Sequence, residues 1–240
     1  MAFLVEGRPR QPFLRAPAVV IWLIAALIGA HVLRVLVFFR QSEALFLAYG
    51  FVPARYSQNF LAVHGVNPGT IFERAVPFVT YIFLHGSFMH VAINSVWLLA
   101  FGPIVARRFG SPMFLLFFFI CGLAGAAAHL VCNWGSTAPV IGASAAVSGL
   151  MAAGFRMLPA ASRHARQDLA PLFTPRVLVW TALWVAVNVI AGLTGLGTGG
   201  GVQLIAWQAH LGGYAAGLVL AGPFEALAAR GQTKEPAPEA

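Results

Sequence analysis

Two side chains in this sequence have the chemistry of a nucleophile and its base. Ser144 lies in the small-residue run GASAAVSG (142–149), and His210 lies in AHLGGYAAG (209–217). A serine hydroxyl is a weak nucleophile until a neighbouring base takes its proton. Neither motif contains Asp or Glu. The sequence therefore predicts a pair of Ser144 and His210 rather than a triad.

A third motif supplies hydrogen-bond donors for the oxyanion that acyl transfer creates. The segment HGSFMHVAIN (85–94) contains His90 and Asn94, whose spacing of four places both on one face of a helix. Together with the backbone N–H of Ser144, their side chains can stabilise charge on a carbonyl oxygen. Gly142 permits a tight turn just before the serine.

The composition indicates that these groups lie within a membrane. Hydrophobic residues make up 59% of the 240 residues and charged residues 9%, against about 45–50% and about 25% in soluble domains. The net charge of +8 does not indicate nucleic-acid binding, because the basic residues form short clusters between apolar runs. Both cysteines fall in one apolar run, so no disulfide framework or metal site is expected. No cofactor is expected either.

Six apolar runs of about 20 residues predict an all-α membrane protein with six transmembrane helices. The runs are 18–39, 83–104, 112–132, 140–158, 177–196 and 202–220. The last two are separated only by a glycine cluster between Gly195 and Gly201. Of the 15 Lys and Arg residues, eleven fall on the side of the two termini and four on the other side. This bias predicts that both termini are cytoplasmic.

The predicted domain organisation follows from these runs. We expect a cytoplasmic segment at 1–17, a transmembrane domain at 18–224 and a short cytoplasmic tail at 225–240.

The segment between Arg40 and Pro77 is apolar but too interrupted by Gly and Pro to span. It predicts a first outer loop lying at the membrane interface, with the following aromatic side chains dipping toward lipid: Phe46, Tyr49, Phe51 and Phe60.

Small residues predict how the nucleophile meets its base. Gly213 and Gly217 form a small-xxx-small face that lets another helix backbone approach closely, and the run after Gly142 offers a matching face. All three motifs enter from the outer side at comparable depth, so their polar groups fall in one layer.

Taken singly, each of these polar residues is more often structural than catalytic. A lone Ser in a transmembrane helix usually bonds its own backbone, and a lone Asn usually joins helices. His31, His129 and Asn188 have no motif partner and are interpreted as structural. The coincidence of three motifs at one depth favours chemistry.

The same motifs resemble those of the rhomboid family of intramembrane serine proteases. HGSFMHVAIN is similar to that family's second-span motif, GASA to its GxSG motif, and AHLGGYAAG to its sixth-span motif. The stretch YGFVPAR (49–55) resembles loop sequence of bacterial members. The resemblance implies a six-helix rhomboid-like bundle.

The resemblance also assigns roles. It implies that Ser144 is the nucleophile, His210 the base, and His90 and Asn94 oxyanion donors. It implies supporting positions at the following residues: His85, Gly142, Gly213 and Gly217.

The sequence departs from the family pattern at three places. Ala145 follows the nucleophile where the family has Gly. Ser148 stands where an aromatic residue often stacks near the histidine. Val76 and Pro77 stand where a Trp-Arg pair is common.

The resemblance implies a multi-pass protein of the bacterial inner membrane that cleaves transmembrane protein substrates near the outer face of the lipid bilayer. A non-catalytic rhomboid-like scaffold that binds client proteins is the alternative, although such relatives typically lack the serine or histidine that this chain keeps. A transporter with His90 and His210 as a proton relay is a third hypothesis. No internal repeat or intramembrane carboxylate supports it.

Overall fold

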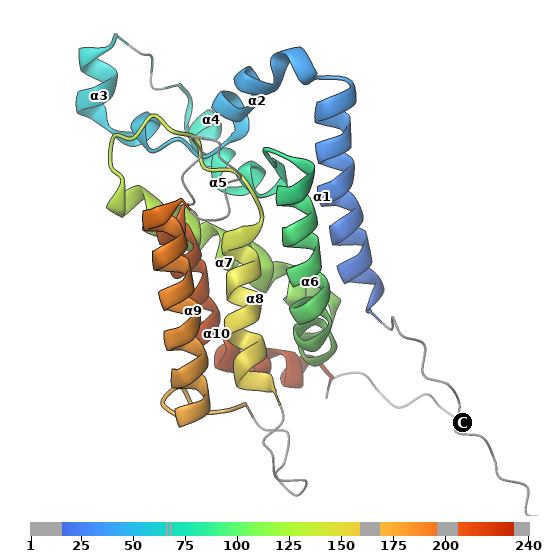
Figure 1. The fold of residues 1–240 in the computed structure, drawn as a ribbon. Coiled ribbons are helices and arrows are strands. Elements are labelled where there is room, and N and C mark those ends of the chain that lie inside the picture. Colours follow the sequence, from blue (N-terminus) through green and yellow to red (C-terminus); the bar gives the residue numbers. More distant parts are fainter. Residues whose placement is uncertain (1–15, 66, 68, 159–168, 196–205, 233–240) are drawn as a thin grey trace, which may run out of the picture.

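The computed structural model describes residues 16–65, 67, 69–158, 169–195 and 206–232, which form a helical bundle with a region of short helices at one end (Figure 1). This region, from Phe39 to Thr80, is here called the outer loop region after the side of the membrane that the sequence predicts for it. Among these residues, five helices are long and apolar enough to cross a membrane. They are α1 (Ala18–Leu36), α6 (Phe88–Phe109), α7 (Ser111–Cys132), α9 (Pro175–Thr194) and α10 (Trp207–Gln232). A sixth, shorter helix lies among them, so the chain is a multi-pass membrane protein with an all-α fold.

The sixth helix, α8 (Ser144–Met157), occupies the centre of the bundle. It packs against α6, α7, α9 and α10, and every residue from Ala145 to Met157 is buried. The prediction of a span of about 20 residues at 140–158 is wrong at its start, because α8 has 14 residues. Val140 instead pairs with the backbone of Phe51, and the chain turns at Gly142 before the helix begins.

The second predicted span also begins later than expected. Residues Tyr81–Phe83 form a short 3₁₀ helix (η3), and α6 begins at Phe88 rather than at residue 83. The side chain of Ser87 accepts a hydrogen bond from the His90 N–H, which caps the helix start. The helix continues to Phe109 and ends at Gly110, whose φ of +77° starts the turn into α7.

The last helix is longer than the predicted span 202–220. It passes through Pro223 and continues to Gln232, and Glu225 forms an ion pair with Arg108 at the end of α6. The predicted start at residue 202 and the glycine cluster beyond Gly195 lie outside the described residues, as do residues 1–15 of the first predicted cytoplasmic segment and residues 233–240 of the second.

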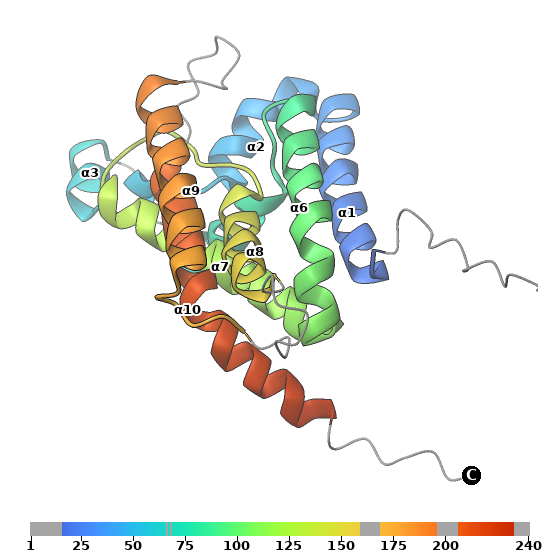
Figure 2. The ribbon, with the colours of Figure 1, turned by 60° about the horizontal axis from the view of Figure 1, so that its bottom comes forward.

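The outer loop region is built from short helices. They are η1 (Phe39–Gln41), α2 (Ser42–Tyr49), η2 (Pro53–Tyr56), α3 (Gln58–Val63), α4 (Ile71–Ala75) and α5 (Pro77–Thr80). They lie at the end of the bundle opposite the first residues of α1 and the last residues of α10 (Figures 1 and 2).

One predicted lipid contact in this region is wrong. Phe51 is fully buried, with 0% of its surface exposed, and packs against the rings of Tyr56 and Phe78 at 5.4 and 4.7 Å. Its backbone forms two hydrogen bonds with Val140, of 3.0 and 2.8 Å, which draw its side chain beneath the loop region. Tyr49, by contrast, is 46% exposed.

Candidate active site

Ser144 and His210 meet where α8 and α10 begin. Ser144 is the first residue of α8, and His210 lies in the first turn of α10. The Nε2 atom of His210 lies 2.7 Å from the Oγ atom of Ser144, a hydrogen-bond distance between residues 66 positions apart in the chain. A base at this distance can take the hydroxyl proton directly.

Glycines on α10 allow the helix approach that brings these residues together. A Cβ atom on Gly213 would overlap the carbonyl oxygen of Ala145, and one on Gly217 would overlap that of Gly149. The two backbones are therefore in direct contact at two points one helical turn apart, as small-residue faces permit.

The side chains of His90 and Asn94 face the turn that precedes Ser144. A Cβ atom on Gly142 would lie 2.6 Å from Nε2 of His90 and 3.7 Å from Nδ2 of Asn94. Gly142 has a φ of +112°, which disfavours every residue with a side chain. Glycine is thus required here both by the backbone angle and by the His90 ring.

His85 and Tyr81 hold this turn in place. The N–H of Gly142 donates to the carbonyl oxygen of Tyr81 at 2.9 Å. The N–H of Ala143 donates to Nε2 of His85 at 3.5 Å, and His85 is fully buried. His31 on α1 donates from Nδ1 to the carbonyl oxygen of His85 at 3.0 Å, so α1 also supports the turn.

One residue beside this site is not predicted by the sequence motifs. Asn188 on α9 was interpreted as structural, yet its Oδ1 atom lies 2.8 Å from Nδ1 of His210. His210 therefore has a polar partner on each ring nitrogen. The only available signal was an Asn inside an apolar run, because the partner of Asn188 depends on how α9 is aligned with α10.

Two departures from the family pattern have a structural basis. Ala145 packs against Gly125 of α7, where an added Cβ atom would lie 2.5 Å from the Ala145 Cβ atom. The methyl group after Ser144 is thus accommodated by a glycine on the neighbouring helix. Ser148 is buried and donates from Oγ to the carbonyl oxygen of Ser144 at 2.7 Å, which occupies its hydroxyl in a bond within α8.

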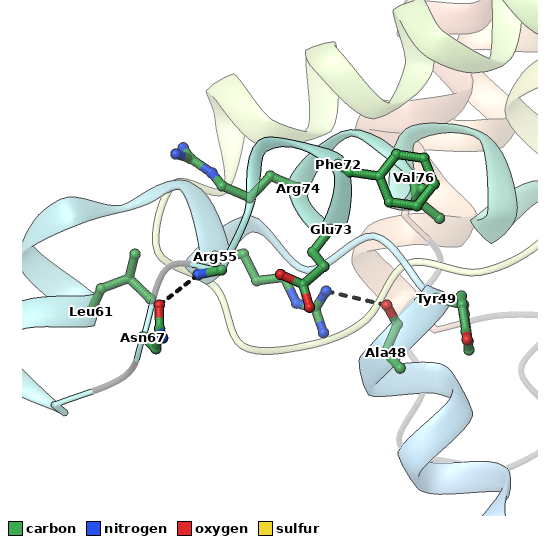
Figure 3. Close-up of a pocket in the computed structure, with 10 residues that line it drawn as sticks. Ala48, Tyr49, Arg55, Leu61, Asn67, Phe72, Glu73, Arg74 and Val76 are labelled. Carbon is green, nitrogen blue, oxygen red and sulfur yellow. Dashed lines mark hydrogen bonds between the residues drawn. The ribbon is translucent and has the colours of Figure 1, made fainter.

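A cavity of about 560 Å³ in the outer loop region is separate from this site (Figure 3). No residue of the three motifs lines it. Arg55 crosses it and donates to the carbonyl oxygens of Leu47 and Ala48 at the end of α2, beside the carboxylate of Glu73 (Figure 3). The backbone N–H and hydroxyl of Thr70 bond to that carboxylate and hold the pKa of Glu73 below its usual value.

These contacts fold the outer loop region into a packed unit, also called the outer cap below. Burial raises the pKa of Tyr56 to about 12, so its hydroxyl stays protonated and donates to the carbonyl oxygen of Arg74 at 2.7 Å. The cap is joined to the active-site turn through the pairing of Phe51 with Val140.

The described residues include no group of three or more His, Cys, Asp or Glu side chains arranged to hold a metal ion. The polar groups that converge near Ser144 are instead a hydroxyl, imidazoles and amides. This set suits acyl transfer within a membrane bundle.

Comparison with known proteins identifies the family. The Rhomboid domain matches residues 73–224, which include all three motifs and more than half of the chain. The chain therefore belongs to the rhomboid family of membrane proteins. It is also 31% identical over 156 residues to Rhomboid protease GluP of Bacillus subtilis (strain 168). That match covers 65% of this chain but only 26% of the relative's length, so the chain spans about a quarter of it.

Proposed function

We propose that this protein is a serine endopeptidase that cleaves transmembrane segments of other membrane proteins. The observation that carries the proposal is the 2.7 Å contact between Nε2 of His210 and Oγ of Ser144 inside a membrane bundle. Membership of the rhomboid family and the similarity to a protein named as a rhomboid protease support it.

The proposed mechanism uses Ser144 and His210 in two half-reactions. The Ser144 oxygen attacks the carbonyl carbon of the scissile peptide bond while Nε2 of His210 takes the hydroxyl proton. The resulting tetrahedral intermediate breaks its C–N bond, and His210 returns the proton to the leaving amine. A water molecule then attacks the acyl-enzyme, again with His210 as base, which releases the carboxylic acid and restores the serine.

The oxyanion that forms in each half-reaction needs hydrogen-bond donors. His90 and Asn94 are the proposed side-chain donors, because their ring and amide nitrogens face the turn at Gly142. The N–H of Ser144 at the start of α8 is the proposed backbone donor, since the first N–H groups of a helix lack intrahelical partners.

The substrate class follows from the place of the site in the bundle. The Ser144–His210 pair lies at the ends of α8 and α10 that are nearer the outer loop region (Figure 1). With both termini in the cytoplasm, as the distribution of basic residues favours, that end faces outward. Substrate helices are then cut near their outer ends, where Gly, Pro or small residues weaken the helix.

The test is cleavage of a model transmembrane substrate by the protein in lipid vesicles. Ser144→Ala is expected to abolish cleavage, whereas Ser148→Ala, a matched change one turn away, retains it. Both variants are expected to show the thermal stability of the wild type. Equal loss of activity in both folded variants contradicts the assignment of Ser144. Substrate binding without cleavage by the folded wild type supports the scaffold alternative instead.

A further inference from the structure

The orientation of the Asn188 side chain is fixed by two hydrogen bonds. Its Nδ2 atom donates to the carbonyl oxygen of Trp184, one turn earlier in α9, at 2.9 Å. The amide nitrogen is thereby assigned, so the atom 2.8 Å from His210 is the amide oxygen, which only accepts hydrogen bonds. It follows that Nδ1 of His210 carries a proton in this arrangement.

This assignment determines what the other ring nitrogen does. A neutral imidazole with its proton on Nδ1 has a free lone pair on Nε2. Nε2 is the atom 2.7 Å from the Ser144 hydroxyl. The opposite tautomer would place an N–H against the serine and could not accept its proton.

Asn188 lies on the most exposed of the candidate spans. In the most apolar 18-residue window of α9, 17% of residues are buried, against 28–44% in the other four spans. A single row of contacts, here called the α9–α10 seam, joins its inner face to α10. The seam consists of Thr181 and Trp184 against Tyr214, Asn188 against His210, and Gly192 against Trp207.

The seam places the Asn188 contact between two packed ends. Trp184 stacks on Tyr214 at 4.1 Å with an interplanar angle of 14°. At the other end, a Cβ atom on Gly192 would overlap the ring of Trp207, so the helices are in close contact there. Asn188 is thus held at a fixed height opposite His210 whenever α9 is seated on α10.

We propose that Asn188 is a positioning residue that holds the His210 ring with Nδ1 protonated and Nε2 toward Ser144, so that the pair is ready only while α9 is seated on α10. The expected effect on kcat rests on the proposed function, whereas the protonation of His210 at Nδ1 does not depend on it. The titratable groups near enough to interact with His210 electrostatically are His90 on α6 and His129 on α7. Neither forms a described hydrogen bond with the His210 ring.

The kinetic test compares three variants on α9 with the wild type in lipid vesicles. Asn188→Leu keeps the approximate volume and removes the acceptor, and it is expected to lower kcat about tenfold, equivalent to about 1.4 kcal/mol, with little change in KM. Asn188→Asp keeps an acceptor oxygen for Nδ1 but loses the donor to the Trp184 carbonyl oxygen, and it is expected to recover part of the lost kcat. Val187→Ala changes the neighbouring residue, which is 57% exposed, and is expected to match the wild type.

A second measurement reads the tautomer directly and does not depend on turnover. ¹⁵N NMR of histidine-labelled protein, with His210→Ala to assign the signals, is expected to find Nδ1 protonated and Nε2 unprotonated in the wild type. In Asn188→Leu, His210 is expected to populate both tautomers, because no acceptor then favours a proton on Nδ1.

The two measurements separate this inference from the proposed function. A wild type that is folded but inactive, with His210 protonated on Nδ1, contradicts the protease proposal and supports the tautomer assignment. An active Asn188→Leu variant with wild-type kcat and an unchanged His210 spectrum overturns the positioning role. Protonation of Nε2 in the wild type also overturns it.

Discussion

The contact between Gly213 and Ala145 makes the Ser144–His210 distance sensitive to a single methyl group. A Cβ atom on Gly213 would overlap the carbonyl oxygen of Ala145 and would lie 2.7 Å from its carbonyl carbon, so the overlap with the backbone is at least 0.7 Å relative to the 3.4 Å at which ordinary contact begins. In Gly213→Ala, α10 must therefore move away from α8. A movement of about 0.7 Å at His210 lengthens the Nε2–Oγ distance from 2.7 Å to about 3.4 Å, beyond the usual limit of about 3.2 Å.

The expected result is a large loss of activity with a modest loss of stability. Displacing reacting groups by about 1 Å can cost about 10²-fold in rate, so we expect a fall of roughly 10- to 100-fold in turnover. Inserting a methyl group into a packed interface costs about 1–3 kcal/mol of unfolding free energy. Cleavage of a transmembrane substrate and thermal unfolding, both in the same lipid or detergent, measure the two effects.

Gly29 offers a matched control for this substitution. It lies in the transmembrane helix α1, and an added Cβ atom there meets nothing within 4 Å. Gly29→Ala is expected to keep wild-type activity. Gly217→Ala places a Cβ atom against the backbone of Gly149, two turns from His210. Its activity is expected to lie between those of Gly213→Ala and Gly29→Ala. Wild-type turnover in a folded Gly213→Ala variant would refute the view that this helix contact sets the geometry of the pair.

Three further substitutions test the proposed oxyanion donor, the turn at Gly142 and the packing of the outer loop region. Asn94→Ala is expected to lower kcat by about 10²–10³-fold and to leave KM nearly unchanged, because an oxyanion donor acts mainly in the transition state; steady-state kinetics that show a raised KM with normal kcat would make Asn94 a binding or packing residue. Gly142→Ala forces a side chain to a φ of +112° and against the His90 ring, and is expected to reduce cleavage at least tenfold and stability by about 1–3 kcal/mol; a variant with wild-type cleavage and melting temperature contradicts this reading of the turn. Phe51→Ala removes a fully buried ring from the outer cap and is expected to cost about 3–5 kcal/mol in unfolding free energy; a loss of less than about 1 kcal/mol, measured by chemical denaturation, is the result expected of a lipid-facing side chain instead.

The sequence predicted the elements of the bundle because a membrane restricts the possibilities. Apolar runs of sufficient length indicated five of the helices directly, since a chain in lipid must satisfy its backbone hydrogen bonds internally. The fourth span was predicted too long, because residues before Ser144 are apolar whether they are helical or extended. Only the pairing of Phe51 with Val140 shows that this stretch belongs to the outer cap.

The polar motifs were visible in the sequence for a related reason. Polar residues are costly in lipid, so Ser144, His210, His90 and Asn94 stand out against their neighbours. Asn188 carries the same signal, but its partner depends on the alignment of α9 with α10, which local patterns do not encode. The predicted lipid contact of Phe51 was wrong because an aromatic residue near the interface can face either lipid or protein.

The central claim is that His210 activates Ser144. It is tested most directly by reacting the reconstituted protein with a fluorophosphonate probe and locating the adduct by mass spectrometry. We expect a single adduct on Ser144, absent from Ser144→Ala and strongly slowed in a folded His210→Ala variant. A folded wild type that is not labelled, an adduct on another serine, or labelling of Ser144 at the same rate without His210 would contradict it.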